Sequence, residues 1–110
     1  GVRDYIHVVD LSRGHVAAVK FALEHFGCEV FNLGTGVGYS VLDMVHTFRD
    51  VNNVPLPYKI VERRPGDVDF MYADPTKSAE LLGWKAEHTL ADMCRDSWRW
   101  QSSNPTGYAD

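Results

Sequence analysis

The sequence has few cysteines and no long apolar run. Its two cysteines, Cys28 and Cys94, lie far apart, and neither has a second cysteine or a histidine at a spacing typical of metal ligands. We therefore expect free thiols and a reducing, cytoplasmic location. No apolar segment approaches the roughly 18 residues that a membrane-spanning helix needs, and no secretory signal begins the chain. We accordingly expect no membrane partner.

An excess of basic residues is also missing. The net charge is −4, and acidic and basic residues are mixed along the chain. Proteins that follow the phosphates of nucleic acids carry a basic patch or stripe, so we predict no nucleic-acid partner. Hydrophobic residues make up 45% and charged residues 24% of the 110 residues, which is typical of a globular domain and argues against disorder. The chain is one modest domain or a piece of a larger one.

Several motifs of known sites are absent as well. The five histidines include no pair at the helical spacing of four residues, so we predict no metal site. There is no Gly-x-Ser-x-Gly motif, and no tyrosine is followed four positions later by lysine. The glycine run from Gly34 to Gly38 lies between an expected strand and an expected helix, but its third glycine comes one position too early for a dinucleotide fingerprint. We predict a structural turn there and no NAD site, and the pattern leaves open whether a ligand lies close to this turn.

The apolar pattern predicts a mixed α/β fold. Residues 2–9 are rich in Val, Ile and Tyr, which favours a strand, and Asp10 is placed to cap a helix that ends near Phe26. Further short strands are expected at residues 30–33, 58–62 and 70–73. Further helices are expected after the capping residues Ser40, Asp74 and Thr89, with Gly83 ending the second of them. The expected order is β-α-β-α-β-turn-β-α-α, followed by an irregular tail over residues 102–110.

The stretch from Glu62 to Asp67, Glu-Arg-Arg-Pro-Gly-Asp, is typical of a binding turn. Pro65 fixes φ near about −65°, and Gly66 tolerates the positive φ that closes a type II turn. Arg64 is then able to present a planar fork to a phosphate, and Asp67 suits the hydroxyls of a sugar. The alternative is an exposed turn whose charged side chains are solvated or paired. The stretch by itself slightly favours that alternative.

A second arginine, Arg3, stands at the start of the first expected strand. If Arg3 projects toward the same site as Arg64, the two guanidinium groups suit a diphosphate. The alternative for Arg3 is a surface ion pair, and the pattern does not decide between the two. The neighbouring Asp4 is interpreted as a polar group at a buried edge.

Three separated stretches resemble a known family. Residues 1–10 (GVRDYIHVVD), 63–67 (RRPGD) and 98–108 (WRWQSSNPTGY) are similar, in that order, to the C-terminal part of the UDP-glucose 4-epimerase family. Residues 72–77 (YADPTK) and 82–85 (LGWK) resemble the same family, so the similarity covers nearly the whole chain. The resemblance implies that residues 1–110 are the C-terminal UDP-sugar-binding region of an extended short-chain dehydrogenase/reductase, without most of the Rossmann domain.

The resemblance also implies roles for individual residues. Arg3 and Arg64 are expected to hold the diphosphate of a UDP-sugar, and Asp67 to hydrogen-bond the uridine ribose. Pro65 and Gly66 are expected to shape the turn.

Met71 stands four positions after Asp67, where the family lines its sugar pocket. A bulky side chain there disfavours N-acetylated sugars and a small one admits them. Methionine is flexible and intermediate in size, which leaves acceptance of UDP-N-acetyl sugars open.

Members of this family interconvert UDP-glucose and UDP-galactose through tightly bound NAD and a 4-keto-sugar. The glycine-rich NAD loop and the Tyr-x-x-x-Lys pair of the family are not among these residues. We therefore expect no catalytic or cofactor-binding residue here, NAD bound by a missing N-terminal domain, and no turnover by the chain alone. The start at Gly1, without Met and directly on an expected strand, looks cut.

Other readings stay open at this point. The chain is alternatively part of another nucleotide-sugar reductase, such as a dehydratase or a UDP-glucuronate epimerase. It is also compatible with a free-standing nucleotide-sugar-binding or interaction module, and with a homo-oligomer formed through uncovered apolar faces.

Overall fold

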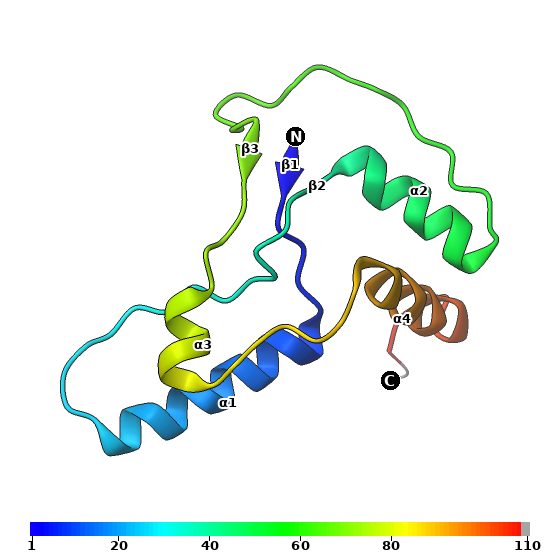
Figure 1. Ribbon diagram of the computed structural model, residues 1–110. Coiled ribbons are helices and arrows are strands. Elements are labelled where there is room, and N and C mark those ends of the chain that lie inside the picture. The colour runs from blue at the N-terminus through cyan, green and yellow to red at the C-terminus, as the bar shows by residue number, and fades with distance from the viewer. Residues whose placement is uncertain (109–110) are drawn as a thin grey trace.

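The computed structural model describes residues 1–108 as four helices and a small sheet (Figure 1). The elements are, in chain order, β1 (Val2–Arg3), α1 (Val8–Glu24), β2 (Tyr39–Ser40), α2 (Val41–Asn52), β3 (Phe70–Met71), α3 (Thr76–Leu82) and α4 (Leu90–Ser103). The mixed α/β class expected from the sequence is confirmed. The two last positions of the expected irregular tail, Ala109 and Asp110, lie outside the described residues.

The sheet has the order β2-β1-β3. Its central strand β1 pairs antiparallel with β2, where Val2 stands opposite Ser40, and parallel with β3, where Arg3 stands opposite Met71. Each strand has two residues. Strands this short contribute few ladder hydrogen bonds, so their alignment depends on contacts outside the ladder.

The expected strand over residues 2–9 is wrong beyond Arg3. Helix α1 already begins at Val8, and its N-cap is His7, whose Nδ1 accepts a hydrogen bond from the Val9 backbone N–H at 3.0 Å. Asp10 is therefore not the cap; it lies in the first turn, with its side chain completely buried. The β-branched residues at the start favoured a strand, but the histidine cap and the tertiary contacts of Asp10 outweigh that weak preference.

The expected helix boundaries elsewhere are mostly confirmed. Ser40 and Thr89 each form a reciprocal capping box, in which their hydroxyl accepts from the amide of Asp43 or Asp92 and that carboxylate accepts from the cap amide. Gly83 ends α3 with a φ of +63°. These motifs connect residues three positions apart, so sequence spacing was sufficient to predict them.

Asp74, the expected N-cap of the third helix, lies one residue before the observed N-cap. Helix α3 begins at Thr76, and its N-cap is Pro75, which has no side chain able to accept a hydrogen bond. Asp74 nevertheless accepts from the Thr76 amide at 3.1 Å and from the Thr76 hydroxyl. The carboxylate thus satisfies a donor of the first turn from one position further out.

Two expected strands do not form. Residues 30–33 and 58–62 run without regular pairing within the described part of the chain, and Val30 and Ile60 are 74% and 81% exposed. In Figure 1 both segments belong to long loops at the periphery of the molecule. A strand needs the backbone hydrogen bonds of a neighbour, and these apolar segments have no neighbouring strand here.

The helices form two pairs. Helix α4 packs along α2, where the rings of Phe48 and Trp98 meet edge to face at 6.0 Å and the Cys94 thiol lies against Met44. Helix α3 packs on α1, and Trp84 is buried beside this pair. The buried apolar side chains among the described residues are few: Trp84, Leu90 and Cys94. No helix in this range is long and apolar enough to cross a membrane.

Candidate functional site

The turn before β3 has the backbone expected from its sequence. The Asp67 amide donates to the Arg64 carbonyl at 3.3 Å, and Gly66 has a φ of +83°. With Pro65 at the second position and the positive φ at the third, this is the type II turn that the sequence predicts. The side chains of its first and last residues are therefore held close together.

Arg64 and Asp67 use this closeness to pair with each other. Arg64 Nε lies 3.0 Å from Asp67 Oδ2, and the arginine side chain is 84% exposed. The alternative of a paired, exposed turn thus describes the contact seen here. Because the contact uses only Nε, both terminal nitrogens of the guanidinium make no hydrogen bond within residues 1–108. The ion pair fixes the plane of the guanidinium while leaving its donor fork toward solvent.

Arg3 reaches the segment that follows the turn. Its guanidinium donates to the Val68 carbonyl at 2.8 Å and to the Val2 carbonyl at 2.7 Å. No carboxylate among the described residues lies within ion-pair distance of Arg3, so a surface ion pair does not account for it. The contact with Val68 places this cation one residue beyond Asp67.

Met71 lies directly beside Arg3. The two residues are partners in the parallel pairing of β1 with β3, and the methionine is 56% exposed. In Figure 1, β1 and β3 lie side by side next to the N-terminus, and the chain enters β3 from the turn at that same end. The structure therefore brings Arg3, the turn from Arg64 to Asp67, and Met71 to one end of the sheet.

Further charged groups beside the sheet make contacts that were not predicted from the sequence, although Asp4 itself was interpreted as a polar group at a buried edge. Arg63 forms an ion pair with Asp69, which links the two sides of the turn. The Asp4 carboxylate accepts four hydrogen bonds. Three come from the loop before β2 and one comes from the segment after β3. The only sequence signal for Asp4 was its position next to Arg3, and its partners lie 31 to 69 positions away.

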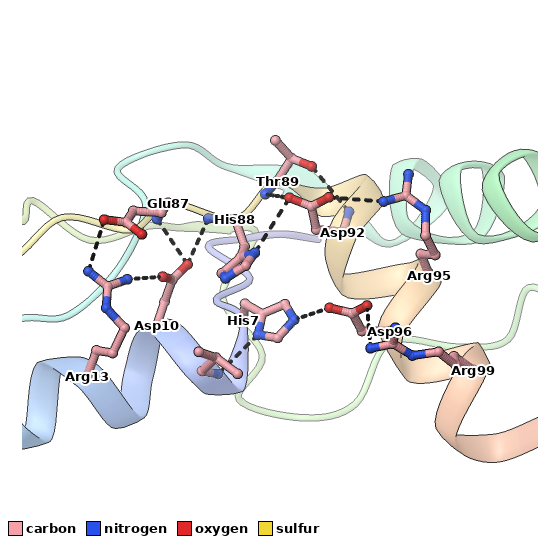
Figure 2. A network of polar contacts seen from close by, with 11 residues as sticks. His7, Asp10, Arg13, Glu87, His88, Thr89, Asp92, Arg95, Asp96 and Arg99 are labelled. Carbon is pink, nitrogen blue, oxygen red and sulfur yellow. Dashed lines mark hydrogen bonds and ion pairs between the residues drawn. The ribbon is translucent and has the colours of Figure 1, made fainter. Parts of the chain in front are cut away.

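A second cluster of charged groups joins α1 to α4 (Figure 2), and we call it the polar network. Its members are His7, Asp10, Arg13, Glu87, His88, Thr89, Asp92, Arg95, Asp96 and Arg99. His7 Nε2 lies 2.7 Å from Asp96 Oδ2, and this hydrogen bond lowers the pKa of Asp96 below its ordinary value. Asp10 accepts from the amides of Glu87 and His88 at 3.1 and 2.9 Å.

The polar network is satisfied by the protein itself. Within residues 1–108 no buried side-chain nitrogen or oxygen lacks a hydrogen-bond partner, and no cluster of His, Cys, Asp or Glu is arranged to hold a metal. The backbone carbonyl of Asp10 is also used, because the Trp84 indole donates to it at 2.9 Å. These contacts connect the start of α1 to α4 and to the segment that leads into it.

Comparison with known proteins identifies the relatives of this fold. The family model described as GDP-mannose 4,6 dehydratase matches residues 1–97. The chain belongs to this family. Among curated relatives, UDP-glucose 4-epimerase of Bacillus subtilis is 56% identical over 108 residues, which are 98% of this chain and 32% of that protein. The resemblance to UDP-glucose 4-epimerases is confirmed.

Solved structures of this family agree with the sequence match. UDP-glucose 4-epimerase from Bifidobacterium longum, in complex with NAD+ and UDP, matches with a TM-score of 0.93 and 51% identity over 98% of this chain and 32% of that one. The enzyme from Stenotrophomonas maltophila, with bound NAD and formylated UDP-arabinopyranose, matches with a TM-score of 0.91 and 46% identity over 96% and 31%. The chain spans about a third of the length of the relatives that it matches.

Proposed function

We propose that this chain is the C-terminal UDP-sugar-binding part of a UDP-glucose 4-epimerase. The observation that carries the proposal is the gathering of Arg3, the Arg64–Asp67 turn and Met71 at one end of the sheet. An epimerase solved with NAD+ and UDP contains a region whose backbone is similar to this chain, at a TM-score of 0.93. The proposed partners are a UDP-sugar and an NAD-binding domain supplied by the remaining length of such an epimerase.

The two arginines account for recognition of the diphosphate. Arg64 is oriented by Asp67 and offers its terminal nitrogens, while Arg3 has five donors and uses two of them on backbone carbonyls. Hydrogen bonds to charged groups contribute roughly 1.5–3 kcal/mol each, so the pair contributes about a hundredfold or more in affinity. Pro65 and Gly66 hold the turn in the shape that presents Arg64.

The neighbouring side chains recognise the two sugars. Asp67 is paired through Oδ2, and its other carboxylate oxygen is an acceptor for the hydroxyls of the uridine ribose. Met71, opposite Arg3 on β3, lines the pocket of the second sugar. Anchoring the UDP end firmly lets the keto-sugar turn over without leaving the protein.

The chemistry of the reaction depends on the rest of the enzyme. NAD, when bound there, supplies the acceptor and donor of the hydride for inversion at the sugar C4. These residues bind and orient the substrate, and the 110-residue chain contains no tyrosine followed four positions later by lysine. We therefore expect the purified chain to show no epimerisation of UDP-galactose above the blank.

A chimeric enzyme tests this proposal. The matching 108 residues of the Bacillus subtilis relative are replaced by this chain, and epimerisation of UDP-galactose is measured. We expect an active chimera in which Arg64→Ala raises KM for UDP-galactose by about tenfold or more. Arg95→Ala is the matched control, because Arg95 forms the same kind of exposed pair, three residues from Asp92.

The outcomes separate the proposal from its alternatives. An Arg64→Ala chimera with the same KM as the Arg95→Ala chimera would mean that the turn does not bind substrate. A folded chimera that retains NAD but converts no UDP-galactose would favour another nucleotide-sugar reductase or a binding module. The 4-epimerase is the better supported function because the relatives with 56% and 51% identity carry that name.

A further inference from the structure

Asp4 is placed where the alignment of the three strands is decided. It follows β1 directly, one residue after Arg3, and its carboxylate is part-buried among backbone groups. A ladder of two-residue strands supplies too few hydrogen bonds to fix its own register. A side chain at the end of β1 that contacts the segments next to both β2 and β3 is therefore able to set this register.

The Asp4 carboxylate makes these contacts on both sides of β1. Oδ1 accepts from the Thr35 amide at 3.0 Å and from the Thr35 hydroxyl at 2.6 Å. Oδ2 accepts from the Gly36 amide at 2.9 Å and from the Ala73 amide at 3.3 Å. Thr35 and Gly36 belong to the loop that leads into β2, and Ala73 lies two residues after Met71. One side chain thus ties the chain before β2 to the chain after β3.

The glycine run is fitted to this contact. A Cβ atom on Gly34 would lie 2.6 Å from Asp4 Oδ2 and 2.6 Å from the Ala73 Cβ. A Cβ atom on Gly38 would lie 2.6 Å from Val2 Cγ1. All three distances are well inside van der Waals contact, so side chains at these positions would separate the loop from the sheet. The glycines predicted as a structural turn therefore have a specific purpose, which is close approach to β1 and to the segment after β3.

We propose that Asp4 is a positioning residue for the UDP-sugar site, holding Arg3 and Met71 side by side through its contacts with the glycine loop and Ala73. This proposal rests on the function proposed above for Arg3 and Met71. Its physical basis is register: a slip of one residue between β1 and β3 would turn one of the two side chains to the other face of the sheet. Asp4 itself touches no ligand.

UDP binding to the chimeric epimerase described above, carrying Asp4→Asn, tests the proposal. An asparagine places its NH2 group against either the Thr35 donors or the amides of Gly36 and Ala73, so two donors lose their acceptor. We expect Asp4→Asn to weaken UDP binding by about tenfold through misplacement of Arg3. The control Asp50→Asn makes the same chemical change on the exposed face of α2, and we expect it to bind UDP normally.

A double-mutant cycle distinguishes positioning from general stabilisation. If Asp4 acts through Arg3, Asp4→Asn weakens UDP binding much less in an Arg3→Ala background, by about threefold or below. Equal effects in both backgrounds would overturn the proposal. Unchanged UDP affinity of Asp4→Asn, with only a lower unfolding temperature, would overturn it as well.

A milder variant covers the case in which Asp4→Asn does not fold. Thr35→Val removes one of the four hydrogen bonds to Asp4 and keeps the backbone amide. We expect about a threefold weaker UDP affinity, which again depends on Arg3. The proposed function has its own control: equal UDP titrations of the chimeric epimerase and of its Arg64→Ala variant would overturn that function. Normal dependence on Arg64 with no effect at Asp4 would overturn only the positioning role.

Discussion

Replacing Asp10 by alanine is the most informative perturbation of this fold. The side chain is completely buried in the first turn of α1, and it accepts from the Glu87 amide at 3.1 Å and the His88 amide at 2.9 Å. It also lies 2.8 Å from the guanidinium of Arg13 (Figure 2). These contacts connect α1 to the segment that leads into α4. Asp10→Ala removes all of them without changing the helix propensity unfavourably.

The size of the effect follows from the groups left behind. Two backbone N–H groups lose their acceptor, and each unsatisfied buried donor costs about 1–3 kcal/mol. The pair with Arg13 adds little, because that side chain is 41% exposed and keeps Glu87 as a partner. We therefore expect the free energy of unfolding to fall by about 2–6 kcal/mol, a large share of the roughly 5–15 kcal/mol that stabilises a typical domain.

Urea denaturation followed by tryptophan fluorescence measures this change. The Trp84 indole donates to the Asp10 carbonyl at 2.9 Å, so the fluorescence reports on the affected region. Asp50→Ala is the control, because Asp50 is exposed on α2, and its effect should stay within about 0.5 kcal/mol. If Asp10→Ala changed the free energy of unfolding by no more than this control, the reasoning from buried amide partners would be refuted.

Two further predictions concern titratable groups. The pKa of Asp96 is lowered by its hydrogen bond with His7, so its stabilising effect is complete above the unfolded value of about 3.9 and is lost as the pH falls through the lower folded pKa. Asp96→Asn keeps an acceptor for His7 but no longer titrates. Urea denaturation measured from pH 6 down to about 2 should therefore show a smaller loss of the free energy of unfolding than in the unsubstituted chain. The same dependence on pH in both chains would contradict this. Burial raises the pKa of the Cys94 thiol while Cys28 is exposed, so a disulfide reagent should react quickly with one thiol of the native chain and with the second only after denaturation. If both thiols of the native chain reacted quickly, or if a fast reaction remained after Cys28→Ser, Cys94 would be accessible and the prediction would be wrong.

The candidate site divides into a local part and a distant part. The type II turn and the closeness of Arg64 and Asp67 follow from Pro65 and Gly66 and were predictable from four residues. The position of Arg3 beside Met71 was not, because 68 positions separate them and their pairing exists only in the sheet. The sequence pattern left Arg3 undecided between a ligand contact and an ion pair, and the tertiary structure excluded the ion pair among the described residues.

The errors in the expected strands have a common physical cause. Val8 and Val9 are good strand formers, yet they start a helix because His7 caps it and its ring is held by Asp96, 89 positions away. Residues 30–33 and 58–62 have the composition of strands, yet no neighbouring strand within residues 1–108 pairs with them. Strand propensity is a property of a single residue, whereas a strand forms only when two segments pair through their backbones.

The sequence by itself determined the features whose partners lie within a few residues: the capping boxes at Ser40 and Thr89, the left-handed Gly83, and the turn at Pro65–Gly66. These motifs have one favourable geometry, set by sterics and a single hydrogen bond. Only the tertiary structure decided the rest. It made Asp10 a buried acceptor instead of a cap, and it turned Asp4 into the link between three segments, because the donors for both carboxylates come from distant parts of the chain.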